Sequence, residues 1–205
     1  MRPHRIARRI VALSVSAAAA TLGFAGTASG ASAPPSALAG LLGQATQQSP
    51  EAVAALYGVL GATGLLPGLP PLPEFGSTRP QNFFYPAPTV GCGVAGNPIT
   101  VTVATAQAGP NYPIPPWVER GNLHFQAVPG YLGIPKTSGL SVAWFNPTTF
   151  RGGIEPLADM LGPFPAMSKT VRTGEGQVFA ALFGSVGYEG GASCTALPTV
   201  GSFTA

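Results

Sequence analysis

From residue 81 onward, closely spaced glycines and prolines divide the sequence into short β-type runs, and this punctuation constrains the fold more than any other feature. The runs are rich in β-branched and aromatic residues, which favour extended structure, whereas glycine and proline favour turns. Seven or eight short strands joined by frequent turns predict a mainly β fold, an Ig-like β-sandwich. The expected strands are 83–85, 99–106, 123–128, 140–145, 153–157, 169–173, 177–188 and 195–203.

Two of the runs alternate clearly between apolar and polar residues. In residues 99–103 the aliphatic side chains of Ile99, Val101 and Val103 share one face, and residues 123–127 repeat the pattern. Successive side chains of a strand point to opposite sides. We therefore expect the apolar face of each strand to be buried and the polar face to meet water.

The longest run, 177–188, allows a second interpretation. Several of its apolar residues, beginning with Phe179, also follow helical spacing, so a helix is an alternative to a strand here. Residues 179–183 do not alternate in polarity. A strand that separates lipid from a water-filled pore would alternate, so this run does not favour a pore.

Residues 32–66 carry two helical patterns, in which apolar residues recur at i, i+3, i+4 and i+7. Ser49 is placed to cap the second helix, with Pro50 at its first position and Glu51 in its first turn. The patterns predict an N-terminal helical hairpin in which each helix has one apolar face. These faces are expected to contain Leu38, Leu41, Leu42 and Ala45, and Val53, Leu56, Tyr57 and Leu60.

Residues 67–80 contain five prolines and two glycines, a composition typical of an extended connector. We place the domain boundary there and expect residues 81–205 to fold as a β-sandwich domain without the helices.

Neither helical stretch reaches the roughly 20 apolar residues that a membrane span requires. The mature chain is therefore expected to have no transmembrane span.

The N-terminal residues 1–31 have the pattern of a secretory signal peptide. Four of the ten basic residues lie within the first nine positions, and a low-charge apolar run, 10–28, follows them. Small residues at 29–31 predict cleavage after Ala31, although cleavage after Ala33 also fits. The pair Arg8 and Arg9 allows a twin-arginine signal, but the residues after it match that signal poorly, so we expect Sec export. The mature protein is then secreted or held in the cell envelope.

Removal of this segment changes the charge balance of the chain. The remaining six basic and seven acidic residues give a net charge of 6 − 7 = −1, whereas the full sequence carries +3. A nucleic-acid-binding domain is usually strongly basic. DNA and RNA are therefore excluded as expected partners.

Cys92 and Cys194 are the only cysteines. In an oxidising compartment two such cysteines most often pair, so we expect a disulfide between them. Together with His124, the single histidine after residue 31, they provide too few ligands at any recognised spacing for a metal site. We therefore expect neither a metal nor a cofactor.

The best candidate binding surface lies in the proline-rich stretch 111–117. Its prolines stiffen the backbone, while Tyr112 and Trp117 offer flat amphipathic surface to a lipid, a glycan or a protein. The alternative is a rigid loop that packs both aromatic rings against the core.

Catalytic candidates are few. His124 is the one histidine available as a base, but it is expected on the polar face of a strand and no GxSxG element accompanies it. Ser185 only approximates such an element. Glu155 and Asp159 are the closest pair of carboxylates in the sequence and could suggest acid and base catalysis. They are explained more simply as solvated charges, with Arg151 as an ion-pair partner. No residue is assigned a catalytic role.

Three further segments stand out: Val90-Gly91-Cys92-Gly93, Leu140-Ser141-Val142-Ala143-Trp144-Phe145-Asn146 and the ending from Cys194 to Phe203. In these segments the chain resembles small exported proteins of actinobacteria of the mycobacterial and nocardial kind, most of which have no known activity. The resemblance covers residues 83–205 and implies no functional residues.

These observations together predict an exported, non-enzymatic envelope or extracellular protein that acts through surface binding. The partner is an envelope lipid, a glycan or a protein. A secreted hydrolase that acts on envelope ester or glycan is the first alternative, and a pore or channel component is the second.

Overall fold

The computed structural model describes residues 35–63, 79–93, 97–111 and 116–205. The expected signal peptide, most of the connector 67–80 and Tyr112 lie outside these residues. The described part contains two helices, α1 (Pro35–Gln48) and α2 (Pro50–Ala62), and is otherwise mainly β, as predicted. The strands are β1 (Gln81–Asn82), β2 (Ala87–Val90), β3 (Ile99–Ala108), β4 (Leu123–Pro129), β5 (Pro135–Ser138), β6 (Ser141–Asn146), β7 (Arg151–Pro156), β8 (Met160–Leu161), β9 (Phe164–Pro165), β10 (Ser168–Val171), β11 (Gln177–Tyr188) and β12 (Ser193–Thr204).

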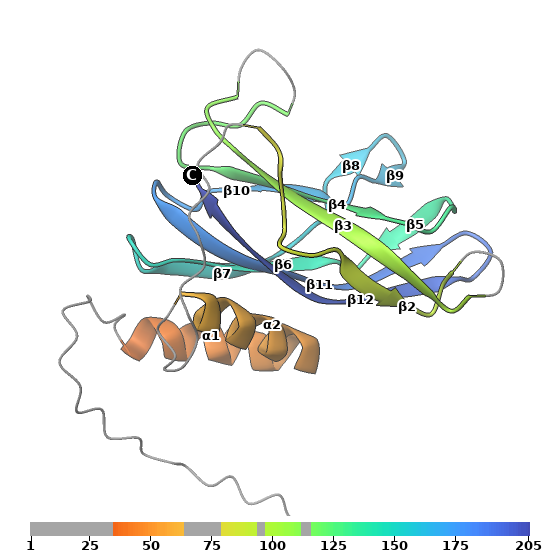
Figure 1. The fold of residues 1–205 in the computed structure, drawn as a ribbon, viewed down its shortest axis with the longest axis horizontal. Helices are drawn as coiled ribbons and strands as arrows, with labels where there is room; N and C mark the ends of the chain where they lie inside the picture. The colour runs from red at the N-terminus through yellow and green to blue at the C-terminus, as the bar shows by residue number, and fades with distance from the viewer. Residues whose placement is uncertain (1–34, 64–78, 94–96, 112–115) are drawn as a thin grey trace, which may run out of the picture. The chain divides into compact units, whose positions relative to one another are not determined.

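Ten of these strands form one antiparallel sheet, which curls strongly on itself (Figure 1). Its order is β10-β4-β3-β2-β12-β11-β6-β7, with β1 paired to β3 and β5 paired to β11. The strands β8 and β9 form a separate hairpin. Because the ten strands are hydrogen-bonded into one sheet, the predicted two-sheet, Ig-like sandwich is not confirmed.

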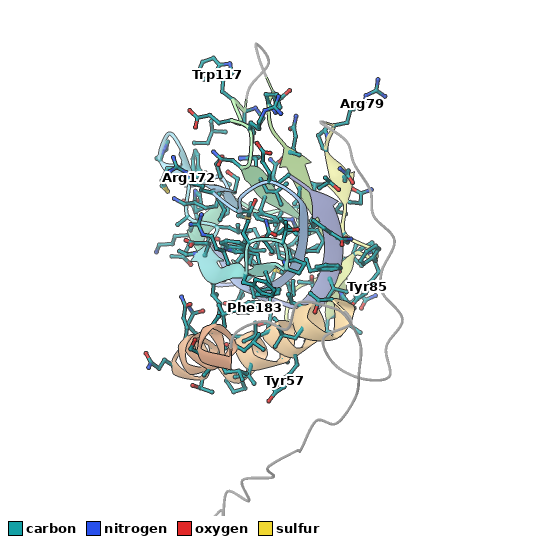
Figure 2. All side chains as sticks on the ribbon, turned by 90° about the vertical axis from the view of Figure 1, so that its left-hand side faces the viewer. Tyr57, Arg79, Tyr85, Trp117, Arg172 and Phe183 are labelled. Atoms are coloured by element: carbon teal, nitrogen blue, oxygen red, sulfur yellow. A yellow bond between two sulfur atoms is a disulfide. The ribbon has the colours of Figure 1, made fainter. Side chains whose placement is uncertain are left out.

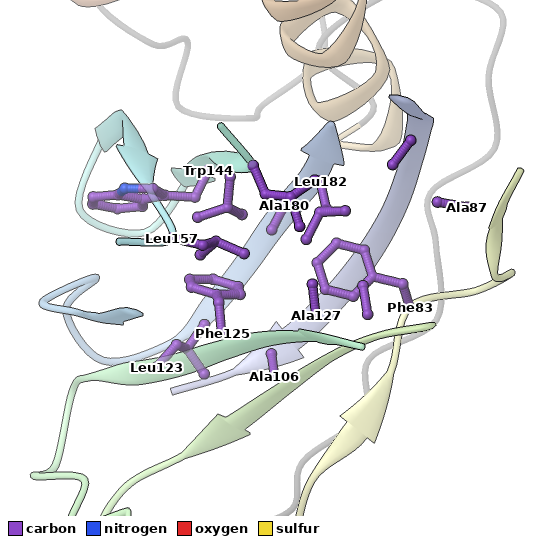
Figure 3. Packing of buried hydrophobic residues seen from close by; sticks show 14 of the residues in the cluster. Phe83, Ala87, Ala106, Leu123, Phe125, Ala127, Trp144, Leu157, Ala180 and Leu182 are labelled. Atoms are coloured by element: carbon purple, nitrogen blue, oxygen red, sulfur yellow. The ribbon is translucent and has the colours of Figure 1, made fainter. Parts of the chain in front are cut away.

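The concave side of the curled sheet holds the larger core. Phe83, Phe125 and Phe203 form its aromatic centre, with ring centroids 5.0 to 6.5 Å apart. Around them pack aliphatic side chains from β4, β6, β11 and the segment after β7, as Figure 3 shows. Leu123 and Phe125 are fully buried here, which confirms the predicted inner face of β4.

A second core lies between the helices and the outer side of the sheet. Phe145 on β6 and Phe179, Ala181 and Phe183 on β11 face the helices. Their neighbours in the chain, including Leu182, face the concave core. Both sides of β11 are therefore buried, and this explains why its sequence does not alternate. Residues 32–205 form one compact unit.

The hairpin of α1 and α2 begins and packs largely as expected. Ser49 caps α2 by accepting a hydrogen bond from the amide of Ala52 at 3.1 Å, and Pro50 occupies the first turn. The buried face of α2, however, consists of Ala52, Ala55, Leu56, Val59 and Leu60. Tyr57 was predicted on that face but is 51% exposed, because small alanines allow the helix to approach the sheet and leave the tyrosine outside.

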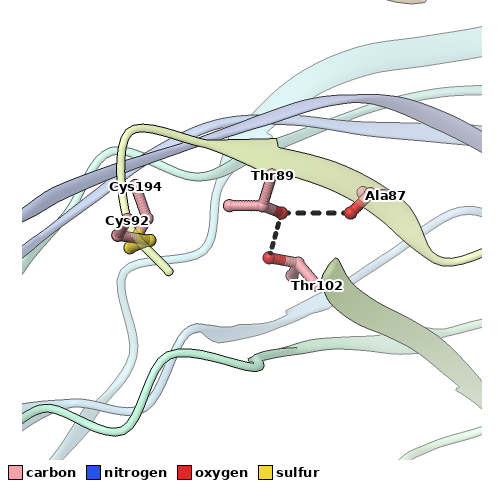
Figure 4. Close-up of a disulfide and its surroundings, with 5 residues drawn as sticks. All are labelled: Ala87, Thr89, Cys92, Thr102 and Cys194. Atoms are coloured by element: carbon pink, nitrogen blue, oxygen red, sulfur yellow. Dashed lines mark hydrogen bonds between the residues drawn. A yellow bond between two sulfur atoms is a disulfide. The ribbon is translucent and has the colours of Figure 1, made fainter. Parts of the chain in front are cut away.

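The disulfide between Cys92 and Cys194 is confirmed (Figure 4). Val90 pairs with Thr195 in the β2 and β12 ladder, so the disulfide extends the contact between these neighbouring strands. It joins β12 to the segment that directly follows β2 in the same sheet, whereas the disulfide of an immunoglobulin domain joins two sheets.

Candidate functional site

The two faces of β3 are arranged opposite to the prediction. Thr102 is 1% exposed on the concave side, whereas Ile99 and Val101 are 56% and 47% exposed on the outer side. The alternation of the sequence is preserved, but the face predicted to be buried is the one that meets solvent.

Two features of the concave side explain this inversion. The hydroxyl groups of Thr89 and Thr102 share a hydrogen bond of 2.8 Å, and the Thr89 hydroxyl also bonds the carbonyl of Ala87 at 3.0 Å (Figure 4). The buried hydroxyls are thus satisfied, which removes most of the cost of burying them. Farther along β3, Ala104 and Ala106 leave room for the aromatic centre of the core.

The inversion creates an uncovered aliphatic surface, which we call the β2–β4 outer face. Adjacent strands place these side chains side by side, because Val90 pairs with Ile99 and Val103 pairs with Val128. None of β2, β3 and β4 contains an aspartate, glutamate, lysine or arginine. The face consists of Val90, Ile99, Val101, Val103 and Val128, with exposed fractions from 38% to 56%.

The predicted aromatic loop is described only in part. Trp117 is 64% exposed and projects outward (Figure 2). Next to it in the chain, Val118 forms a β-bridge with Asn111, and the Asn111 side chain donates a hydrogen bond to the carbonyl of Pro116 at 3.0 Å. Tyr112 lies outside the described residues, so its pairing with Trp117 as one binding surface stays a prediction.

His124 lies on the outer side of β4, as predicted, opposite Thr170 of β10. Its Nδ1 shares a hydrogen bond of 3.0 Å with the Thr170 hydroxyl. Burial lowers the pKa of His124 from its ordinary 6.5, while the carboxylate of Asp159 acts in the opposite direction. Burial therefore favours the neutral ring. The ring is bonded to a threonine, which is not the serine and carboxylate arrangement of a hydrolase.

The remaining catalytic candidates lie on different segments of the chain. Ser185 is half-buried on β11 next to the irregular pairing at Gly184, whose φ of 115° suits glycine. Asp159 forms an ion pair with Lys169 at 3.6 Å. Glu155 lies on β7, and the expected ion pair between it and Arg151 is not found among the described residues.

Comparisons of this chain with family models, curated proteins and solved structures found no match. The function must therefore be argued from the surfaces themselves. Within the described ranges, no group of three or more histidine, cysteine or acidic side chains could hold a metal ion. In the same part of the chain, neither helix is long and apolar enough to cross a membrane.

Proposed function

We propose that this chain is an exported protein that acts by binding through the β2–β4 outer face. The main evidence is that the helices cover one part of the outer side of the sheet and leave another part exposed to solvent. The helices cover the apolar side chains of β6 and β11, whereas Ile99, Val101 and Val128 remain about half exposed. Contiguous apolar surface of this kind often marks an interaction site in exported and cytosolic proteins alike.

The partner that best fits this face is a second copy of the chain. The three strands that carry the face contain no ionised side chain, so two copies can meet there without burying an unpaired charge. A twofold contact uses the same patch on both molecules, and aliphatic sheet faces pack well at about 10 Å separation. An anionic lipid surface fits less well, because the face offers no cation to attract it.

Export is supported by the basic and apolar N-terminal sequence and is compatible with the disulfide. The hydrolase alternative requires a nucleophile and an orienting carboxylate at His124. Thr170 occupies the position at its Nδ1, and Asp159 is engaged by Lys169. We therefore retain binding as the proposed function.

Sedimentation equilibrium over a range of protein concentrations tests the self-association. The wild type is expected to dimerise, and Val101→Lys is expected to weaken the dimer at least tenfold, because it places a charge at the centre of the contact. Ala39→Lys, on the exposed side of α1, adds the same charge elsewhere and should leave the dimer unchanged.

A wild-type protein that stays monomeric at its highest soluble concentration would overturn the proposal of a second copy. Equal weakening by Ala39→Lys would also overturn it, because the effect would then reflect net charge alone. Binding of the monomer to neutral lipid vesicles, lost in Val101→Lys, would assign the face to lipid and likewise reject the dimer.

A further inference from the structure

The two ends of the curled sheet, β7 and β10, meet along an incomplete seam. After β7, the amide of Asp159 donates a hydrogen bond of 3.1 Å to the carbonyl of Ser168, and the ion pair between Lys169 and Asp159 reinforces this contact. Along the rest of the seam, β7 pairs with β6 and β10 pairs with β4, but they do not pair with each other. One end of the seam is closed and the other is open.

The open part of the seam contains a pocket of about 330 Å³. The strand β7 contributes Arg151, Gly152 and Glu155 to its walls, and β10 with the residue after it contributes Thr170, Val171 and Arg172. Trp144 of β6 lies at its inner side, in contact with the concave core (Figure 3). We call this the seam pocket.

Trp144 supplies an unused hydrogen-bond donor. Its side chain is only 4% exposed. Of the buried side-chain nitrogen and oxygen atoms in the described residues, only its indole Nε1 has no hydrogen-bond partner. Leaving a buried donor unpaired costs about 1 to 3 kcal/mol. Such a donor at the wall of a pocket therefore points to a group that is bound there.

Gly153, the ladder partner of Trp144, has no side chain and lets the indole lie close to β7. A Cβ on Gly153 would lie 3.2 Å from Trp144 Nε1 and 3.6 Å from Glu155 Oε1. The indole N–H donor and the Glu155 carboxylate are therefore at most 3.2 + 3.6 = 6.8 Å apart, on the same side of β7. A hydroxyl group both accepts and donates hydrogen bonds, so it satisfies both neighbours at once.

The mouth of the pocket is positively charged. Arg151 and Arg172 are both exposed at its rim, and Figure 2 shows Arg172 projecting from the molecule. In the described part of the chain the ion pair is formed by Lys169 and Asp159, so neither guanidinium is neutralised by a carboxylate. Planar guanidinium groups match a carboxylate well, because each can donate two parallel hydrogen bonds.

We propose that the seam pocket binds a small hydroxylated carboxylate, such as a sugar acid. Its carboxylate lies between Arg151 and Arg172, and one of its hydroxyl groups lies between Trp144 Nε1 and Glu155. A doubly charged phosphate fits less well, because the carboxylate of Glu155 repels it. The inference is independent of the β2–β4 outer face, since the pocket lies on other strands.

Tryptophan fluorescence provides a direct test. The chain contains two tryptophans, and Trp117→Phe leaves Trp144 as the single reporter at the pocket. Titration of this variant with D-glucuronate is expected to give a saturable change in emission. Acetate, D-glucose and inorganic phosphate should each bind at least tenfold more weakly. Methyl β-D-glucuronide tests whether the acid at the end of a glycan binds as well as the free acid.

Four variants in the Trp117→Phe background locate the binding. Arg151→Gln and Arg172→Gln should each weaken the binding of D-glucuronate about tenfold or more, because each removes a charged hydrogen-bonding group. Glu155→Gln should weaken binding less, since its amide oxygen still accepts. Lys136→Gln removes the same charge on β5, at the wall of a different pocket, and should change the affinity less than twofold.

The absence of saturable binding would overturn the proposal. An equal effect of Lys136→Gln would also overturn it, because the interaction would then be general electrostatic attraction. Phosphate that binds as tightly as D-glucuronate would reject a carboxylate ligand. Thermal melts of Arg151→Gln and Arg172→Gln, whose side chains are exposed, establish that lost binding is not lost folding.

Discussion

At the level of single residues, the buried pair Thr89 and Thr102 determines which face of β3 turns inward. Thr89→Val is expected to lower the free energy of unfolding by about 1 to 3 kcal/mol, because it leaves the Thr102 hydroxyl buried without its partner. Thr102→Val should cost less, since the Thr89 hydroxyl keeps its bond to Ala87.

The double variant Thr89→Val with Thr102→Val should cost less than Thr89→Val alone, because two valines of similar shape replace both hydroxyls. Urea unfolding of all four proteins measures these differences as a double-mutant cycle. If the losses in free energy of unfolding of the two single variants simply add up in the double variant, the two hydroxyls do not stabilise each other.

The second prediction at this scale concerns His124 and pH. Burial lowers its pKa in the folded state, so below pH 6.5 the unfolded chain binds the proton more readily than the folded protein. Stability is therefore expected to fall as the pH drops below about 6.5, until the folded-state pKa is passed.

His124→Gln should weaken this acid dependence, because glutamine does not titrate. Thermal melts between pH 5 and 8, a range that spans the ordinary histidine pKa of about 6.5, measure the effect. If the variant and the wild type lose stability in parallel, another group carries the acid sensitivity.

At the level of elements, the disulfide constrains the chain over a sequence separation of 102 residues. In the chain-entropy account, opening a loop of this length lowers the free energy of unfolding by about 4 to 5 kcal/mol. Comparison of the oxidised protein with a Cys92→Ala, Cys194→Ala variant in urea measures the loss. A loss below about 1 kcal/mol would show that the unfolded chain is already restrained without the disulfide, by residual contact between the segments that form β2 and β12.

The helices lead to a further prediction at this scale. The sequence suggested that residues 81–205 fold without them, but the structure places Phe145, Phe179 and Phe183 beneath α1 and α2. Removal of the helices exposes these rings, at about 1.5 to 3 kcal/mol for each large side chain that becomes fully exposed.

The fragment 81–205 should therefore be much less stable than the chain from residue 32 and should bind a hydrophobic dye. Urea unfolding and dye fluorescence measure this. If the fragment were as stable as the longer chain, the prediction from the sequence that residues 81–205 fold independently would be correct.

Most elements could be predicted because local sequence specifies them. The strand at 177–188 was predicted with the bounds that β11 has, and Ser49 was identified as the cap of α2. The strands β2, β5, β8 and β9 were missed, and residues 83–85, which were predicted to be a strand, form the bend between β1 and β2. The prolines of β2 and β5 disfavour a strand, and only neighbouring strands supply the missing context.

The sites were less predictable than the elements, because they depend on long-range pairing. Nothing in the alternation of residues 99–103 shows that Thr102 will meet Thr89, so the exposed face was assigned to the core. The seam pocket joins Trp144 and Arg151 to Arg172 only because the sheet curls until β7 reaches β10. The pairing of Gly153 with Trp144 indicates this site only once the register of β6 and β7 is known.

At the level of the whole molecule, the proposed export predicts a defined mature protein. Mass spectrometry of the secreted chain should find Ser32 at its N-terminus, because residues 29–31 are small and follow the apolar run. The Cys92 to Cys194 cross-link should be complete in that material, since the disulfide forms in an oxidising compartment.

The export route can be tested in the same way. Conversion of Arg8 and Arg9 to lysine keeps the positive charge that Sec export requires and removes the arginine pair that the twin-arginine route reads. We expect equal secretion of the variant and the wild type, measured by immunoblots of medium and cell fractions, while replacement of all four N-terminal arginines by glutamine should reduce it. Retention of the lysine variant inside the cell would show the twin-arginine route, under which the protein folds before it crosses the membrane and closes its disulfide afterwards.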